Sequence, residues 1–589
     1  MIKLFKHLHK EEWFLIIVSI IFIIAQAWLD LHIPEYMSNI TYLITNETTE
    51  LGPILEMGGK MILCAIGSAL TAMTVGYFAA KIAAKFAKRL RREIFCKVGS
   101  FSMEEMGKFS TSSLITRSTN DITQIQRFVA IGLQVIIKAP IISIMAIDKI
   151  LQTGRMEWSV LVAGSVLALV IVIVAVMRYT IPKFEKIQKI TDNLNRVTRE
   201  NLSGLEVIRA YNAEEYQENK FNEVNTELTN NNLKVQKRMA VLHPSMVFVL
   251  NFISLGIYWI GAFLINGASG AEQMALFSNM VVFSSYAMQV IIAFTLLTIV
   301  FVMLPRASIS AKRINQVLDT KTKLKEGNKK EGTEEGTEEG TIEFKNVSFS
   351  YPDSEEYVVK NINFSAKKGE TVALIGATGS GKTTIVNLAL RAYDVQKGEV
   401  FVDGINVKEY TKNALCNKFG YVPQKAILFS GTVNSNIAYG DNGQEKTTQE
   451  EVKKAIEIAQ SKDFVEKLEK GYDGMVAQGG GNFSGGQKQR LSIARAIARK
   501  PEIYIFDDSF SALDYKTDRL LRKELKEKTA GVTTLIVAQR IGTIKDADKI
   551  LVIKDGEIVG NGKHEELLKS CEEYKKIAYS QLSKEELEG

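Results

Sequence analysis

Six long apolar segments in the first half of the chain constrain its fold more than any other feature. They lie near residues 13–31, 57–80, 128–147, 158–178, 242–266 and 273–304. A helix that crosses a bilayer needs about 20 mostly apolar residues, and each segment provides or nearly provides that length. The sequence therefore predicts an α-helical membrane domain with six transmembrane helices over residues 1–320.

The length of the chain and its charge distribution require a second domain. At 589 residues the chain is too long for one hydrophobic core. Most of the charged residues, which make up 24% of the chain, follow residue 306. The net charge of +7 is modest, and much of the basic excess flanks apolar segments. This pattern indicates a chain whose surroundings include membrane lipid, and it argues against nucleic-acid binding.

Basic residues in the connecting segments predict the orientation in the membrane. Leu31–Pro53 has no Lys or Arg, whereas Lys81–Arg127 carries ten against four acidic residues. Because basic loops stay on the cytoplasmic side, the first loop is expected outside and the second inside. An even number of spans then places the N-terminus and the soluble domain in the cytoplasm of a multi-pass cell-membrane protein.

The second half of the chain has the pattern of a soluble α/β domain. Residues 321–340, rich in Gly, Glu and Lys, are expected to form a low-complexity linker. From residue 341 to 589, short β-branched runs such as TVALIG and IYIFDD alternate with helical stretches. This alternation predicts a sheet flanked by helices.

A glycine-rich loop, GATGSGKT, lies between a predicted strand and a predicted helix. In that context it is a phosphate-binding P-loop, whose backbone amides and helix N-terminus face phosphate oxygens. We expect Lys382 to reach the β- and γ-phosphates of ATP and Thr383 to bind Mg²⁺. The predicted nucleotide-binding residues of this loop are Gly376, Thr378, Gly379, Ser380, Gly381, Lys382, Thr383 and Thr384.

Two further motifs follow the P-loop. The apolar strand IYIFDD ends in acids, and Asp507 is placed to hold Mg²⁺. FSGGQKQR, Phe483–Arg490, puts a serine and two glycines before a helix and so forms a second phosphate cradle. One chain with two cradles suggests a dimer in which each chain completes the other's site.

These motifs in this order, after six apolar segments, resemble ATP-binding-cassette (ABC) exporters along nearly the whole chain. The closest resemblance is to the degenerate-site subunit of bacterial heterodimeric multidrug exporters. It implies that Tyr351 stacks on adenine and that Gln424 contacts Mg²⁺ and couples to the membrane domain. It also implies that segments near Ser113–Gln126 and Gly204–Phe221 are cytoplasmic coupling regions. The signature residues expected to contact the partner's ATP are Ser484, Gly485, Gly486 and Gln487, and the interface loop contains Ser511 and Asp514.

Two departures from the family pattern predict unequal ATP sites. Asp508 stands where the family usually has a catalytic glutamate. A general base must come within about 3 Å of the water it activates, and the shorter aspartate is expected not to reach it. Gln539 stands where the family has a switch histidine, and an amide carries no proton or charge at neutral pH. Gln478 replaces a common glutamate just before the signature. We expect this chain's own site to bind ATP and turn over slowly, with hydrolysis mainly at the site shared with a second half-transporter.

The sequence leaves the transported substrate open. Lys138 interrupts the third apolar segment and either faces a cavity or a charged partner, or lies in the cytoplasm. The sixth segment contains Tyr286 and Gln289 among soft side chains that suit a promiscuous apolar pocket, or else lipid contact and packing. We expect export of hydrophobic or amphiphilic small molecules such as drugs. The alternatives are a lipid or peptide translocator, a homodimeric exporter and an ATP-gated regulatory subunit.

Overall fold

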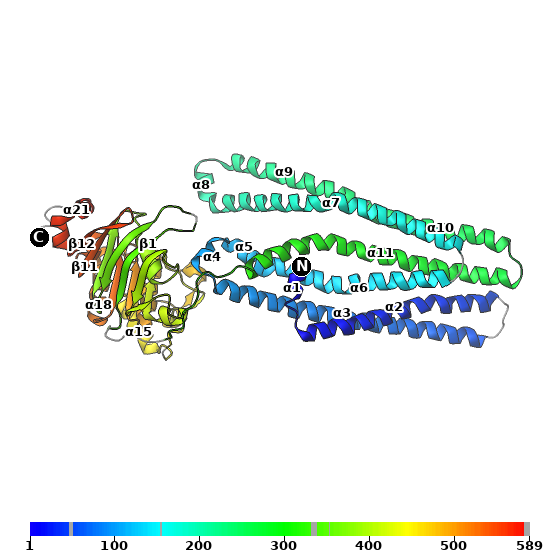
Figure 1. Cartoon of the computed structure of the whole chain (residues 1–589), viewed down its shortest axis with the longest axis horizontal. Helices are drawn as coiled ribbons and strands as arrows, with labels where there is room; N and C mark the ends of the chain where they lie inside the picture. The colour runs from blue at the N-terminus through cyan, green and yellow to red at the C-terminus, as the bar shows by residue number, and fades with distance from the viewer. Residues whose placement is uncertain (46–50, 153–155, 331–337, 353, 444, 582–589) are drawn as a thin grey trace. The chain divides into compact units, whose positions relative to one another are not determined.

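The computed structural model describes residues 1–45, 51–152, 156–330, 338–352, 354–443 and 445–581. The chain forms two compact units (Figure 1). The first unit contains Met1–Ser100 and Phe109–Thr320, and the second contains Phe101–Lys108 and Lys321–Gly589.

The first unit is helical. Its α-helices are α1 (Ile2–Phe5), α2 (Lys10–Thr45), α3 (Leu51–Gly99), α5 (Thr111–Thr116), α6 (Ile122–Gln152), α7 (Met156–Ser203), α8 (Leu205–Ala210), α9 (Glu214–Met239), α10 (Leu242–Asn266) and α11 (Ala271–Leu318), with a π-helical turn η1 (Arg117–Asp121) before α6. Within the described residues, six helices are long and apolar enough to cross a membrane, which confirms the predicted spans. Between 11% and 33% of the residues in their most apolar windows are buried, so the outward faces are apolar and suit lipid or a partner chain.

The spanning helices are much longer than a bilayer requires. Helix α3 has 49 residues and α7 has 48. At about 1.5 Å per residue, such helices are about 70 Å long, against about 30 Å of hydrocarbon. The polar segments that follow the second and fourth apolar segments therefore continue these spans as helix, in α3 and α7.

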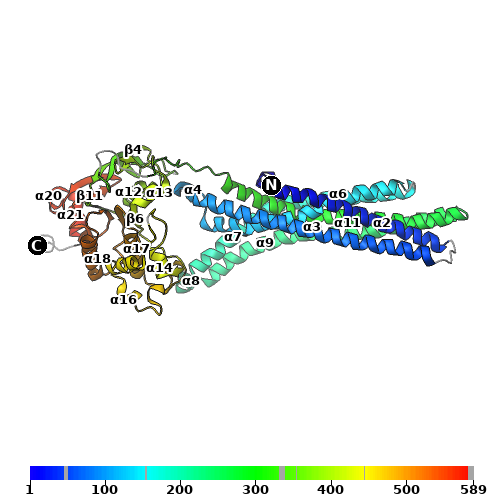
Figure 2. The same cartoon turned by 90° about the horizontal axis from the view of Figure 1, so that it is seen from below.

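Packing divides these helices into two groups. Helices α2, α3, α6 and α11 pack on one another, whereas α7 runs along α9 and α10 (Figures 1 and 2). A buried apolar cluster joins α7 and α10 to α11, and in it the rings of Trp158 and Phe283 lie 5.3 Å apart. Gly261 allows the close approach of α10, because a Cβ there would lie 2.5 Å from Met280 Sδ.

The second unit contains a parallel sheet and an antiparallel sheet. Its strands are β1 (Ile342–Phe349), β2 (Val359–Ala366), β3 (Thr371–Gly376), β4 (Lys397–Val402), β5 (Ile405–Asn406), β6 (Phe419–Val422), β7 (Gly431–Thr432), β8 (Met475–Val476), β9 (Ile503–Asp507), β10 (Thr533–Val537), β11 (Lys549–Lys554) and β12 (Glu557–Gly562). Its helices are α4 (Met103–Gly107), α12 (Lys382–Ala389), α13 (Lys412–Lys418), α14 (Val433–Ile437), α15 (Gln449–Ile458), α16 (Lys462–Val465), α17 (Gly485–Ala498), α18 (Tyr515–Lys528), α19 (Ile541–Ile544), α20 (His564–Ser570) and α21 (Glu572–Tyr579), with 3₁₀ turns η2 (Gly471–Asp473) and η3 (Gln478–Gly480).

The larger sheet positions the functional motifs. Its described strands are ordered β12-β11-β3-β10-β9-β6, and only β12 pairs antiparallel with its neighbour. Strand β9 is buried along its whole length, as its continuous apolar run predicts for a central parallel strand. Since the carboxyl ends of parallel strands share one edge, the segments that follow β3, β10, β9 and β6 meet there. The smaller sheet, β2-β1-β4-β5, is antiparallel. This architecture confirms the expected α/β domain.

The first part of the expected linker lies along the second unit. The Gly327 amide donates to the Tyr410 carbonyl at 3.1 Å, and the Lys329 amide donates to the Glu409 carbonyl at 3.0 Å. Arg391 Nη2 donates to the Lys325 carbonyl at 2.7 Å. Residues 331–337 of the linker lie outside the described residues.

Candidate ATP-binding site

The phosphate loop connects β3 to α12, as the sequence predicts. Glycine is required at both ends of the loop. A Cβ on Gly376 would lie 2.1 Å from the Ile553 carbonyl oxygen, and Gly381 has a left-handed φ of 101°. Thr378 and Gly379 are exposed at the crest of the loop, and Ser380 is buried. The loop therefore presents exposed backbone and the N-terminus of α12, which is the arrangement that binds phosphate groups.

Lys382 supplies the cation of this loop. Its Nζ donates to the carbonyls of Gly376 at 2.9 Å and Ala377 at 2.8 Å. Burial lowers the pKa of Lys382, while the neighbouring carboxylates of Asp507 and Asp508 oppose the shift. The ammonium group thus lies at the concave side of the loop, close to the two acids at the end of β9.

Thr383 and Asp507 form an oxygen-rich pair beside the loop. Thr383 Oγ1 donates to Asp507 Oδ1 at 3.1 Å. Burial raises the pKa of the Asp507 carboxyl, and the charge of Asp508 adds to this effect. Hydroxyl and carboxylate oxygens are the ligands that Mg²⁺ prefers, and a cation here would offset the cost of the buried charge. These residues fit the Mg²⁺ that an ATP site uses.

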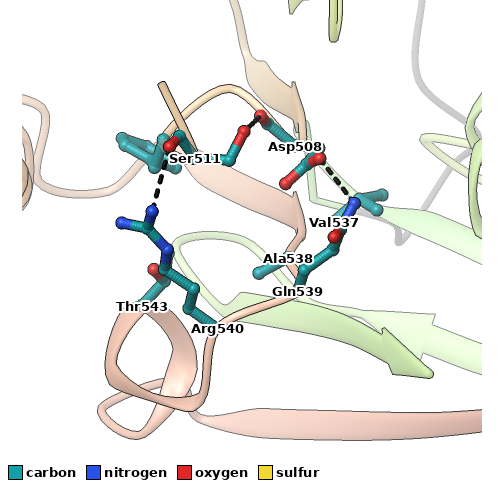
Figure 3. Close-up of a pocket in the computed structure, with 8 residues that line it drawn as sticks. Asp508, Ser511, Val537, Ala538, Gln539, Arg540 and Thr543 are labelled. Carbon is teal, nitrogen blue, oxygen red and sulfur yellow. Dashed lines mark hydrogen bonds between the residues drawn. The ribbon is translucent and has the colours of Figure 1, made fainter. Parts of the chain in front are cut away.

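Asp508 lies at the centre of a small amide-carboxylate network, of which Figure 3 shows the bond to Gln539. Its Oδ2 accepts from Gln539 Nε2 at 2.8 Å and from Gln424 Nε2 at 3.3 Å. Burial raises the pKa of the Asp508 carboxyl, and the hydrogen bond from Gln424 opposes that shift. The three residues follow β9, β10 and β6, so the parallel sheet brings them together.

The backbone at Asp508 has an unusual conformation that the sequence did not reveal. Its φ is 49°, in the left-handed region, and its amide donates to the Val537 carbonyl at 2.9 Å. Aspartate tolerates this region better than most residues because its short polar side chain bonds locally. Position 508 therefore has a conformational reason to carry aspartate in addition to any chemical one.

A second bridge joins the loops that follow β9 and β10. Arg540 Nη2 donates to the Ser511 carbonyl at 3.1 Å, and Ser511 Oγ donates to the Asp508 carbonyl at 2.9 Å (Figure 3). The hollow among Asp508, Ser511, Gln539 and Arg540 has a volume of about 10 Å³, which is about the size of one water molecule. Sequence reasoning missed Arg540. Its position directly after Gln539 places it beside the site, but its contact with Ser511 depends on the folded loop.

Tyr351 also lies near the phosphate loop. Its hydroxyl is 3.1 Å from Thr384 Oγ1 in the first turn of α12. Its ring meets those of Phe349 and Tyr393 edge-on, with centroids 5.2 and 5.4 Å apart. This placement is compatible with the expected contact to adenine.

The signature residues form a separate surface. Ser484 caps α17 through a reciprocal capping box, in which the Gln487 amide donates to Ser484 Oγ at 3.3 Å and Gln487 Oε1 accepts from the Ser484 amide at 2.9 Å. Ser484 and Gly485 are exposed, and Gly486 is half-buried. Within the described residues, no hydrogen bond joins this turn to the phosphate loop. Asp514 likewise caps α18, with the Thr517 amide donating to its Oδ1 at 3.0 Å.

The predicted membrane-site residues lie on α6 and α11. Lys138 Nζ is 3.7 Å from Asp30 Oδ2 on α2, which supports a charged partner in the helix bundle over a cytoplasmic position. Tyr286 is buried and its hydroxyl donates to Glu35 Oε1 at 3.2 Å. Gln289 is half-buried.

A short segment before the first expected coupling region belongs to the ATP-binding unit. The segment that clusters with the ATP-binding unit is Phe101–Lys108, whereas Ser113–Gln126 belongs to the helical unit. Ser102 and Glu105 form a capping box that begins α4. The backbone amide of Lys323 also donates a hydrogen bond to Glu105 Oε1 at 3.1 Å. The S-x-x-E spacing at Ser102 was the signal that would have located this helix.

Comparison with known proteins places these features in one family. Residues 16–319 match the ABC transporter transmembrane region, and residues 359–511 match the ABC transporter family. An uncharacterised ABC transporter ATP-binding protein of Mycobacterium bovis is 37% identical over 91% of this chain and 90% of the relative. An ATP-dependent lipid A-core flippase of Haemophilus influenzae is 31% identical over 86% of this chain and 84% of the relative.

A solved structure shares the fold. A bacterial Atm1-family ABC exporter with ATP bound superimposes with a TM-score of 0.82 at 22% identity, over 96% of this chain and 97% of the other. The fold and the P-loop site thus define an ATP-driven membrane transporter. The chain belongs to the ABC exporters, as a half-transporter with one membrane domain and one ATP-binding domain.

Proposed function

We propose that this chain is one subunit of a heterodimeric exporter of hydrophobic or amphiphilic small molecules, with its own ATP site catalytically degenerate. The contact between Asp508 and Gln539 is the observation that carries the proposal. An exporter site that hydrolyses ATP rapidly needs a base that reaches the attacking water and a switch residue that stabilises charge. Here the base position carries the shorter Asp508, and the switch position carries the uncharged Gln539. The two side chains are hydrogen-bonded to each other.

The surroundings of Asp508 limit its use as a base. A base must approach its water to about 3 Å, and aspartate is one methylene shorter than glutamate. Its Oδ2 accepts from both Gln539 and Gln424, which are donors that stabilise the charged form without accepting a proton. The retained Lys382, Thr383 and Asp507 support binding of Mg²⁺ and ATP. This combination favours a site that holds ATP and turns over slowly.

The signature turn supports a complementary role for this chain. Ser484 and the glycines that follow it retain an exposed helix N-terminus, which is the arrangement that contacts phosphate. In a dimer this turn would complete the partner's site, where we place most of the hydrolysis. The chain would be oriented with its N-terminus and ATP-binding domain in the cytoplasm, as the loop charges predict.

The substrate class rests on the membrane helices. Met280 of α11 lies in the buried cluster with α7 and α10, and Phe294 packs against it. Such soft side chains adapt to varied apolar ligands. A lipid translocator is the second candidate, and the likeness to a lipid A-core flippase favours it. Both candidates carry an amphiphile, so they differ in the molecule moved and not in the ATP-driven mechanism.

Two assays test the proposal. ATP turnover of the purified chain alone is expected to be low and to rise when the partner half-transporter is added. Rapid turnover by the chain alone would overturn the heterodimer. In vesicles containing the complete transporter, we expect ATP-dependent movement of a fluorescent cationic amphiphile. Movement of a fluorescent phospholipid alone would favour the lipid translocator, and downhill passage without hydrolysis would favour an ATP-gated subunit.

A further inference from the structure

The C-terminal end of the described chain reaches the ATP site through one side chain. Gln581 Nε2 donates to the Gln539 carbonyl at 2.7 Å, and Gln581 Oε1 accepts from the Ile541 amide at 2.8 Å. The side-chain amide of Gln581 therefore forms hydrogen bonds with the backbone on both sides of Arg540. Gln581 is exposed and lies 42 residues beyond Gln539 in the sequence, so this is a tertiary contact.

Helix α21, which ends two residues before Gln581, is firmly docked. Tyr574 and Ala578 of α21 are fully buried in the core of the second unit. Tyr574 also bonds His564 Nδ1 at 2.7 Å. The Gln581 amide donates to the Ala578 carbonyl at 3.1 Å, so the residue follows directly from the end of α21. Docking of α21 thus fixes the place from which the Gln581 side chain extends.

The bonds of Gln581 restrain the loop that follows β10. Ile541 is the first residue of α19, and Arg540, at the N-cap position, makes no side-chain capping bond. Gln581 supplies the missing acceptor for the first helical amide, which otherwise has no partner within the helix. Because the carbonyl of Gln539 is held as well, the backbone from 539 to 541 has little rotational freedom. The direction of two side chains follows from this backbone: Gln539 toward Asp508, and Arg540 toward Ser511.

We propose that Gln581 is a positioning residue of the ATP site, which orients Gln539 and Arg540 and thereby prolongs retention of ATP. It acts through the 539–541 backbone. The inference rests on the proposed function only in treating this site as one that retains ATP. It makes the C-terminal helix α21 part of the nucleotide site.

Retention of nucleotide on this chain tests the proposal. The complete transporter is loaded with Mg²⁺ and a photoreactive, non-hydrolysable ATP analogue and then chased with unlabelled ATP. Crosslinking by light at intervals and separation of the chains by electrophoresis give the rate of loss from this chain alone. We expect about fivefold faster loss in Gln581→Ala, which is the size of effect of a typical hydrogen bond. Gln581→Glu, which keeps the acceptor for Ile541 and lacks the donor to Gln539, is also expected to lose the analogue faster.

Two controls separate positioning from general stability. Ser580→Ala removes a hydroxyl that bonds the Ile577 carbonyl within the same helix end, and we expect unchanged retention. In a Gln539→Ala background, adding Gln581→Ala is expected to cause a smaller further acceleration, because only the orientation of Arg540 is then affected. Equal retention in wild type and Gln581→Ala, or an undiminished effect in the Gln539→Ala background, would overturn the proposal. Since the analogue is not hydrolysed, rapid ATP turnover by the chain alone would refute the heterodimer without altering this result.

Discussion

Gln539 Nε2 lies 2.8 Å from Asp508 Oδ2, so two residues that depart from the ABC exporter pattern bond to each other. Gln424 donates to the same carboxylate oxygen at 3.3 Å. The carboxylate is thereby surrounded by amide donors that cannot take up a proton. On the proposed function, this arrangement favours ATP binding over rapid hydrolysis at the site.

Restoring the family residues at both positions should raise ATP turnover. In Asp508→Glu/Gln539→His, the longer carboxylate and the ionisable ring replace the amide-carboxylate pair. A well-placed general base contributes about 10²–10⁴-fold to a rate, and we expect a gain of about tenfold or more. Turnover of the purified double variant is compared with that of wild type and each single variant. A double variant no faster than wild type would show that these two residues do not limit turnover.

Ser484 should matter more for hydrolysis by the complete transporter than Lys382. Ser484→Ala removes the side chain of the signature turn, which we place in the hydrolytic site, whereas Lys382→Ala weakens ATP binding at this chain's own site. We expect a turnover loss of about 100-fold for Ser484→Ala and a smaller one for Lys382→Ala. Ser484→Ala also costs about 1 kcal/mol of helix capping, so Ser484→Asp, which retains a cap, is the matched control. A larger loss for Lys382→Ala would reverse the assignment of the two sites.

The fold and most of the candidate site could be predicted from the sequence because they depend on local patterns. Apolar segment length indicates the spans, and the strand-glycine loop-helix order locates Lys382 and Thr383. The contacts of Arg540 and Gln581 could not be predicted, because they depend on how α21 docks and on the direction of the chain after β10. The left-handed φ of Asp508 is likewise a property of the folded loop, and no neighbouring residue signals it.

The charge pair in the helical unit should stabilise the fold. Lys138 and Asp30 are 24% and 21% exposed, and Ser68 Oγ also donates to Asp30. Lys138→Ala leaves the carboxylate without its cation, and we expect a loss of about 2 kcal/mol, between the values for surface and fully buried pairs. Asp30→Asn/Lys138→Gln should be more stable than Lys138→Ala. The midpoints of thermal unfolding in detergent measure the stability of these variants. Lys60→Ala, which breaks a more exposed pair with Glu56, is the control. Equal midpoints for all variants would show that the pair contributes nothing.

Asp507 should make stability depend on pH in the absence of Mg²⁺ and nucleotide. Burial raises the pKa of its carboxyl in the folded protein. Between the ordinary aspartate pKa of about 3.9 and the raised value, the folded state binds more protons than the unfolded state, so stability falls as pH rises through that window. Asp507→Asn removes this titration. We expect its unfolding midpoint to exceed that of wild type at pH 7, with a smaller difference at pH 4.

Asp507→Asn is compared with a matched control variant, and its response to Mg²⁺ and ATP gives a second test. Glu469→Gln removes an exposed carboxylate and should show no such pH-dependent difference. Added Mg²⁺ and ATP should stabilise wild type more than Asp507→Asn, because the variant lacks a charged oxygen ligand. A difference between wild type and Asp507→Asn that stays constant from pH 4 to pH 7 would contradict the assigned direction of the pKa shift.

The most direct test of unequal sites is vanadate trapping of a photoreactive nucleotide in the complete transporter. Vanadate traps the nucleotide at the site that has hydrolysed it, and the crosslink marks the chain whose phosphate loop holds that nucleotide. We predict that the label appears on the partner chain and that Ser484→Ala in this chain abolishes it. Strong vanadate-dependent labelling of this chain, at Gly376–Thr383, would contradict the account.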